Sequence, residues 1–171
     1  EDLKSLGNKV YTASVGPLSS NYDRAVELYA QIRGTCTDYG EVHSKKYGHT
    51  RFGRCYTIPL YDKWDENNKI HLIGHSQGGQ TVRKLLSLLK EGSPEEIINN
   101  KNDVNDLFLG KKNWVTSITT ISSPNNGTTL TNIMYPDFKL EELGSIQITQ
   151  LRLADTMVQK VIICYLWDKV I

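Results

Sequence analysis

The pentapeptide Gly74-His75-Ser76-Gln77-Gly78 constrains the possible fold more than any other segment of the chain. It follows an apolar strand candidate, Ile70 to Gly74, and precedes a helix candidate, Gln77 to Lys90. A serine on a sharp strand-to-helix turn needs glycines two residues before and after it, because side chains there would collide. Such a turn lifts the serine oxygen to the carboxyl edge of a sheet, and the helix N-terminus favours negative charge beside it.

This context predicts that Ser76 is a nucleophile and that the backbone N–H of Gln77 donates a hydrogen bond to an oxyanion. The alternative is a chance Gly-x-Ser-x-Gly sequence in a loop. The strand candidate before the motif and the helix candidate after it argue against that alternative.

A nucleophilic serine needs a base, and in folds with this turn the acid and then the histidine follow the serine in the chain. The four histidines are His43, His49, His71 and His75, so none of them follows Ser76. His71 is on the strand candidate and His75 is within the turn, so neither is placed to deprotonate the serine. The sequence therefore predicts no complete triad in the expected order.

Strand and helix candidates alternate along the chain, which predicts an α/β fold with a mainly parallel sheet flanked by helices. Residues 20–34 are predicted to form a helix, because Ser20 opens an S-x-x-D capping pattern and Gly34 follows the last apolar position. The other expected elements are a strand over Lys9 to Val15, a helix opening at Ser93-Pro94 and a strand over Trp114 to Ile121.

Two segments do not fit this alternation clearly. Residues 35–57 are predicted to be a long loop with little structure of its own, and such loops are uncommon unless they are functional or held in place. Val158 to Trp167 is apolar enough for a buried strand or a buried helix, and its periodicity does not decide between them.

Composition narrows the class of protein. The chain has 171 residues, with 20 Lys or Arg, 19 Asp or Glu and a net charge of +1, which gives no electrostatic basis for binding nucleic acid or an anionic membrane. No apolar run approaches the ~18 to 20 residues of a membrane span. Glu1 is interpreted as a mature or internal start, because no basic-then-apolar leader begins the chain.

The three cysteines, Cys36, Cys55 and Cys164, match no zinc or redox spacing. Their odd number argues against a closed disulfide framework. We expect buried or idle thiols, since free cysteine is usually buried.

Asp23, His43 and His49 form the second group of interest, because an aspartate with two histidines suits zinc. The two histidines are six positions apart in the predicted loop, which is not a standard ligand spacing. From spacing alone, two solvated loop histidines and a helix-capping aspartate are the better interpretation. One physical point favours a metal, because a long irregular loop needs something to hold it.

Longer segments closely resemble the secreted lipases of staphylococci and thermophilic bacilli. The matching segments are Tyr11 to Ala25, Asp38-Tyr39-Gly40 with His43, Tyr47-Gly48-His49, Arg51-Phe52-Gly53, Gly74 to Thr81, Ser117 to Ile121, Pro124 to Thr128 except Asn125, and Asp137 to Leu140. The resemblance covers about residues 10–143, and residues 145–171 are unassigned. It implies that residues 1–171 form a single partial α/β-hydrolase domain, from a fragment or truncated member of that family.

The resemblance implies a lipase that hydrolyses triacylglycerol esters with Ser76 as nucleophile. It also implies a structural zinc held by two aspartates and two histidines, of which Asp23, His43 and His49 match three. Asp168 is a candidate for the fourth ligand, but its offset differs from that of the family.

The chain also departs from the family pattern. Most of the helical lid segment before Asp137 is missing, and Asn125 stands where the family has a histidine. In the family, the catalytic aspartate and histidine and the calcium site lie beyond the position of Leu143.

Two functions therefore stay open: a secreted ester hydrolase whose base lies outside this chain, and an inactive remnant that binds zinc or a partner. A third hypothesis is another serine hydrolase, such as a carboxylesterase or acyltransferase, with its base on another chain. The expected partners are a lipid ester substrate and, transiently, a lipid interface, with no nucleic acid. Unpaired sheet edges also predict self-association.

Overall fold

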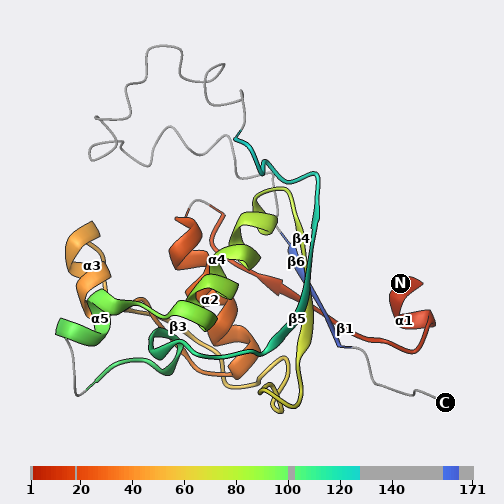
Figure 1. Cartoon of the computed structure of the whole chain (residues 1–171), viewed down its shortest axis with the longest axis horizontal. Helices are drawn as coiled ribbons and strands as arrows, with labels where there is room; N and C mark the ends of the chain where they lie inside the picture. The colour runs from red at the N-terminus through yellow and green to blue at the C-terminus, as the bar shows by residue number, and fades with distance from the viewer. Residues whose placement is uncertain (1, 18, 100–102, 128–159, 166–171) are drawn as a thin grey trace.

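The computed structural model describes residues 2–17, 19–99, 103–127 and 160–165. Helices and strands alternate along most of this length (Figure 1). The elements are α1 (Asp2–Ser5), β1 (Lys9–Ser14), α2 (Asn21–Arg33), β2 (Cys36–Asp38), α3 (Glu41–Tyr47), β3 (Phe52–Cys55), β4 (Ile70–His75), α4 (Gln77–Glu91), α5 (Pro94–Asn99), the 3₁₀-helix η1 (Asp106–Leu109), β5 (Val115–Ile121) and β6 (Lys160–Tyr165).

The main sheet has four strands in the order β1-β6-β4-β5. β4 and β5 are parallel, as predicted, and β1 points the same way, because β6 is antiparallel to both β1 and β4. The expectation of a mainly parallel sheet is therefore wrong, since two of the three described ladders are antiparallel. The apolar segment 158–167, which could not be assigned from its periodicity, contains β6, the strand that runs antiparallel to its two neighbours.

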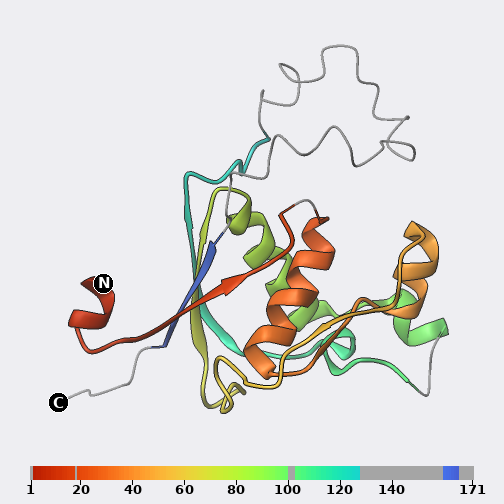
Figure 2. The same cartoon turned by 180° about the vertical axis from the view of Figure 1, so that it is seen from behind.

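The two long helices lie on one side of the sheet. Both views show α2 and α4 on the same side of it, with α3 and α5 beyond them (Figures 1 and 2). The chain crosses the sheet in one direction, from β1 to β4 to β5, and right-handed crossovers then place both connecting helices on the same face. The expectation of a sheet flanked by helices is confirmed, with both long helices on one face.

The hydrophobic core fills the space between this face of the sheet and the two long helices. Ile70 and Leu72 on β4, Leu28 on α2 and Leu85 on α4 are fully buried there. The alternate residues of β4 are only partly buried, which agrees with a sheet covered on one face. Burial of each large aliphatic side chain contributes about 1.5–3 kcal/mol, so this face holds the fold together.

Helix α2 begins and ends where its capping residues predict. The Ser20 hydroxyl accepts a hydrogen bond from the N–H of Asp23, and Gly34 adopts the left-handed conformation with φ 69° at the C-terminal end. The last turn is closed by the Gly34 N–H, which donates to the carbonyl of Ala30. The strands predicted over 9–15, 70–74 and 114–121 and the helix opening at Ser93 are likewise confirmed.

Residues 35–57 are not the structureless loop that the sequence predicts. They form a two-stranded antiparallel sheet of β2 and β3, with helix α3 between the strands. The three elements are short, at three, seven and four residues, so their sequences carry too little periodicity to reveal them. Contacts to the rest of the fold stabilise them instead.

A disulfide between Cys36 and Cys55 joins the outer ends of this small sheet. The expectation of buried or idle thiols is therefore wrong for these two residues, and both are exposed. An odd number of cysteines excludes a fully paired set, but it does not exclude one disulfide. We call the segment from Cys36 to Cys55 the clamped loop.

Several sequence predictions lie outside the described residues. They concern Thr128, the motif Asp137 to Leu140, the candidate ligand Asp168 and most of the tail from residue 145. No helix within the described ranges is long and apolar enough to cross a membrane.

Candidate active site and metal centre

Ser76 occupies the turn between β4 and α4 with φ 54° and ψ −127°. A positive φ at a non-glycine residue is strained, by about 1–3 kcal/mol, and persists only where neighbouring structure holds it. Here the Ser76 N–H donates to the carbonyl of Ile121 on β5 at 2.8 Å, and the Gly79 N–H donates to the Ser76 carbonyl at 3.1 Å. The strained strand-to-helix turn expected from the pentapeptide is present, and Ser76 is partly exposed within it.

Two glycines of this turn, Gly74 and Gly79, have no room for a side chain. A methyl group added at Gly74 would overlap the backbone of Gly78 and Gly79. One added at Gly79 would overlap the side chain of Ser123 on the segment after β5. The steric reason given for glycine before the serine is therefore confirmed at Gly74.

Gln77, the expected oxyanion donor, is tied to α2 through a buried arginine. Nη1 of Arg24 donates to the Gln77 side-chain oxygen at 3.0 Å and to the carbonyl of Gly16 at 3.2 Å. Its Nε donates to the Thr81 hydroxyl at 2.9 Å. Burial lowers the pKa of Arg24, and the Glu27 carboxylate acts in the opposite direction. Sequence reasoning missed Arg24, although its position four residues before the buried Leu28 places it on the inner face of α2.

None of the four histidines, all of which the structure describes, is placed to act as a base for Ser76. Among the described residues, no histidine is hydrogen-bonded to the Ser76 hydroxyl. His71 Nδ1 lies 2.7 Å from the Ser117 hydroxyl, and His75 is exposed beside the turn. His43 and His49 belong to a separate cluster with Asp23.

Asp23, His43 and His49 meet although they come from α2, α3 and the segment after α3. One ligand atom from each lies within 4.8 Å of the others. Oδ1 of Asp23 is 2.8 Å from His43 Nε2 and 3.8 Å from His49 Nε2. The structure brings together all three residues that the resemblance selected.

The electrostatics of this cluster favour an ionised aspartate. Burial acts to raise the pKa of Asp23, but hydrogen bonds from His43 and Ser20 outweigh it and lower the pKa below its usual value. The His43 ring stacks on the ring of Tyr22 with centroids 4.0 Å apart, which limits its rotation.

The cluster fits a divalent metal. A tetrahedral zinc with bonds of about 2.0–2.1 Å separates its ligand atoms by roughly 3.4 Å. The Asp23 to His43 and Asp23 to His49 separations of 2.8 and 3.8 Å lie on either side of that value. One carboxylate and two imidazoles are also a donor set that zinc accepts. The group is therefore compatible with a metal, and its geometry does not identify which one.

A cavity of about 390 Å³ opens beside the cluster. It is lined by Ser20, Tyr22, Asp23, His43, Tyr47 and Lys84. The ammonium of Lys84 lies 5.5 Å from the centre of the Tyr22 ring. Two of the three candidate ligands, Asp23 and His43, thus line this cavity.

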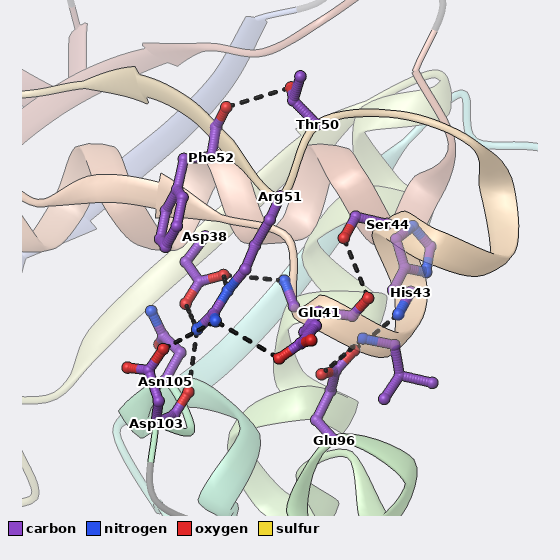
Figure 3. A network of polar contacts seen from close by, with 12 residues as sticks. Asp38, Glu41, His43, Ser44, Thr50, Arg51, Phe52, Glu96, Asp103 and Asn105 are labelled. Carbon is purple, nitrogen blue, oxygen red and sulfur yellow. Dashed lines mark hydrogen bonds and ion pairs between the residues drawn. The ribbon is translucent and has the colours of Figure 1, made fainter. Parts of the chain in front are cut away.

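Charged residues outside the cluster hold the clamped loop in place (Figure 3). Arg51 donates two hydrogen bonds to the Asp38 carboxylate, at 2.9 and 3.0 Å, and one to the Asp103 carboxylate at 2.8 Å. Glu96 on α5 accepts backbone hydrogen bonds from Val42 and His43 at the start of α3. Sequence reasoning missed Glu96, and no local pattern identifies it, because its partners are more than 50 residues away.

A family model described as the lipase-like C-terminal domain matches residues 1–142. A lipase of Staphylococcus epidermidis is 46% identical over 138 residues, which cover 78% of this chain and 20% of that protein. Lipase 1 of Staphylococcus aureus is 48% identical over 132 residues, which cover 75% of this chain and 19% of that protein. The chain therefore spans about a fifth of the length of the curated relatives that it matches.

Solved structures are also similar to this chain. EstA from Clostridium botulinum is 54% identical with a TM-score of 0.74, over 77% of this chain and 30% of that one. Lipase 1 from Pelosinus fermentans is 53% identical with a TM-score of 0.73, over 78% and 36%. The Staphylococcus hyicus lipase is 35% identical with a TM-score of 0.66, over 85% and 45%. These neighbours and the parallel β4–β5 pair with its helices agree on an α/β-type fold.

Proposed function

Because the chain belongs to the family of lipase-like C-terminal domains, we propose that it is the nucleophile-bearing part of an α/β-hydrolase that cleaves lipid esters. In this proposal it is one partial hydrolase domain over residues 1–171, and triacylglycerols are the substrate class. The observation that carries the proposal is the turn at Ser76, with its positive φ and a glycine at position 74 that no side chain could replace.

The proposed reaction runs through an acyl-enzyme. The Ser76 oxygen forms a bond to the ester carbonyl carbon while a base takes the serine proton. The carbonyl oxygen becomes negative, and the N–H of Gln77 donates a hydrogen bond to it. The C–O bond to the leaving alcohol then breaks, and the alcohol departs with a proton from the base. Water cleaves the acyl-enzyme to a fatty acid and restores Ser76.

None of the histidines that the structure describes is proposed as the base of this reaction. We propose that it lies outside this chain, since no histidine follows Ser76 in the sequence. A serine without its base retains only a small part of the activity, so turnover by this chain alone should be lower by several orders of magnitude.

Labelling with a fluorophosphonate probe tests the proposal directly. We expect slow labelling at Ser76, loss of labelling in Ser76→Ala, and wild-type labelling in Ser87→Ala, which alters a serine further along the same helix. Hydrolysis of a short-chain nitrophenyl ester should follow the same order. Absence of both labelling and turnover in the wild-type chain would contradict the proposed activity for this chain.

For the metal, we propose a structural zinc held by Asp23, His43 and His49. Bound there, the ion would cross-link α2 to the clamped loop and neutralise the Asp23 carboxylate. A chelator should then lower the melting temperature of the wild-type protein but not that of Asp23→Asn. An unchanged wild-type melt, with no zinc in elemental analysis, would refute the site.

A second candidate function is an inactive domain of hydrolase type that binds metal or a partner. It is favoured by the assembled metal cluster together with the lack of a histidine at Ser76. Zinc binding without any labelling of Ser76 is the result that would select it. For either function we propose an extracellular location and a lipid ester or lipid interface as partner, on the strength of the lipase relatives.

A further inference from the structure

Helix α3, which carries His43, lacks a capping side chain of its own. Its N-cap residue is Gly40, and no side-chain hydrogen bond is made from that position. A helix leaves its first N–H groups without partners inside the helix, so another group must satisfy them. A glutamate from α5 satisfies two of them here.

Glu96 supplies this cap from a distant part of the chain (Figure 3). Its Oε1 accepts the N–H of His43 at 2.8 Å, and its Oε2 accepts the N–H of Val42 at 3.1 Å. Glu96 is only 2% exposed, so its carboxylate is held among protein atoms and not in solvent. Such charge-assisted hydrogen bonds are stronger than bonds between neutral groups.

Gly40 makes this approach possible. It has a φ of 90°, which favours glycine, and a methyl group placed on it would overlap the Glu96 carboxylate. The absence of a side chain at the N-cap and the presence of a carboxylate from α5 are therefore two parts of one arrangement. A general helix-packing contact would not require both.

His43, whose backbone N–H is bound by Glu96, is also a candidate metal ligand. The Glu96 carboxylate holds the backbone of His43, the Tyr22 ring limits its side chain, and Asp23 lies 2.8 Å from its Nε2. A ligand that is held in place before the metal arrives loses less conformational entropy on binding. Groups that orient metal ligands typically change metal affinity by about 10- to 100-fold when they are removed.

We propose that Glu96 is a positioning residue for the metal centre, which caps α3 so that His43 is held in its ligating position before the ion binds. This inference rests on the proposed metal site at Asp23, His43 and His49. It assigns Glu96 no contact with the metal itself. Its effect reaches the ion through the backbone of His43.

The test compares zinc affinity among Glu96→Ala, Glu96→Gln and Glu95→Gln, each measured in competition with a chromogenic chelator. Glu95 is the matched control, since it is an exposed glutamate on the same helix. We expect Glu96→Ala to bind zinc about 10- to 100-fold more weakly. Glu96→Gln keeps one accepting oxygen and should fall between Glu96→Ala and wild type. Glu95→Gln should stay within about twofold of wild type, because its side chain does not cap α3.

Two further readouts separate positioning from general stability. The visible absorption of bound Co²⁺ reports ligand geometry and should change in Glu96→Ala, even at saturating metal. The rise in melting temperature on adding zinc should also be smaller in Glu96→Gln than in Glu95→Gln. If Glu96→Ala does not fold, the affinity of Glu96→Gln decides the question.

The outcomes also distinguish this inference from the proposal on which it rests. Wild-type protein that binds no zinc would refute the metal site, and the inference with it. If wild type binds zinc and both Glu96 variants bind it with the wild-type affinity, the proposed role of Glu96 is overturned and the metal site stands.

Discussion

Replacing Cys36 and Cys55 together by serine should lower the free energy of unfolding by about 3 kcal/mol. The two cysteines are 19 residues apart in the chain and both are exposed, so serine fits at either position without a cavity. The cross-link restricts the unfolded chain, and for a closed loop of roughly 20 residues the loss of that restriction is worth about 3 kcal/mol. For a chain of this size, such a loss lowers the melting temperature by about 6–12 °C.

Urea denaturation of wild type, the double variant and Cys36→Ser, all without metal, measures this difference. The single variant should lose as much stability as the double variant, because either substitution opens the loop. The control is wild type under reducing conditions, which should match the double variant. A double variant within about 1 kcal/mol of oxidised wild type would refute the reasoning, and would mean that the remaining contacts of the clamped loop already restrict it.

The other predictions concern charge, pH and the sheet. Arg51→Lys should lower the unfolding free energy by about 2 kcal/mol, because lysine cannot reproduce the paired bonds to Asp38 and the bond to Asp103. Lys45→Gln, which removes an exposed ion pair with Glu41, is the control and should leave the midpoint of the same urea titration unchanged. In metal-free protein, burial acts to raise the pKa of Asp23, but hydrogen bonds from His43 and Ser20 prevail and hold that pKa below its usual value. Its contribution to stability is therefore present above about pH 4 and lost as the pH falls through the folded pKa, so the stability difference between wild type and Asp23→Asn should shrink on titration from pH 6 to pH 3. A constant difference would contradict that sign. Removing residues 160–171 deletes β6, which pairs with six residues of β1 and four of β4. The truncated chain should then associate more strongly than the intact chain in light scattering, because the exposed strand edges can pair with other molecules.

The elements that the sequence predicted well are those specified by local chemistry. Helix α2 begins at a capping serine and ends at a glycine with positive φ, and both effects operate within a few residues of the helix ends. The turn at Ser76 belongs to the same class, since Gly74 and Gly78 approach each other within one tight turn. Short-range sterics and hydrogen bonds decide such features, so they can be read from the chain alone.

The clamped loop could not be predicted in the same way. Its strands and helix are too short to show a period, and the contacts that hold it come from Asp103 and Glu96, far away in the sequence. The direction of β6 was also undetermined, because an apolar segment carries no information about which neighbour it pairs with. In each case the deciding interaction joins residues that the sequence separates widely.

The sequence by itself thus determined the strand-to-helix turn at Ser76, the ends of α2 and the residue types of the candidate metal site. Only the tertiary structure decided that Asp23, His43 and His49 meet, because spacing along the chain says nothing about how α2 and α3 pack. The disulfide and the Glu96 cap were decided at the same level. The physical reason is that local preferences act over a few residues, whereas a site made of separate elements exists only once the core has brought those elements together.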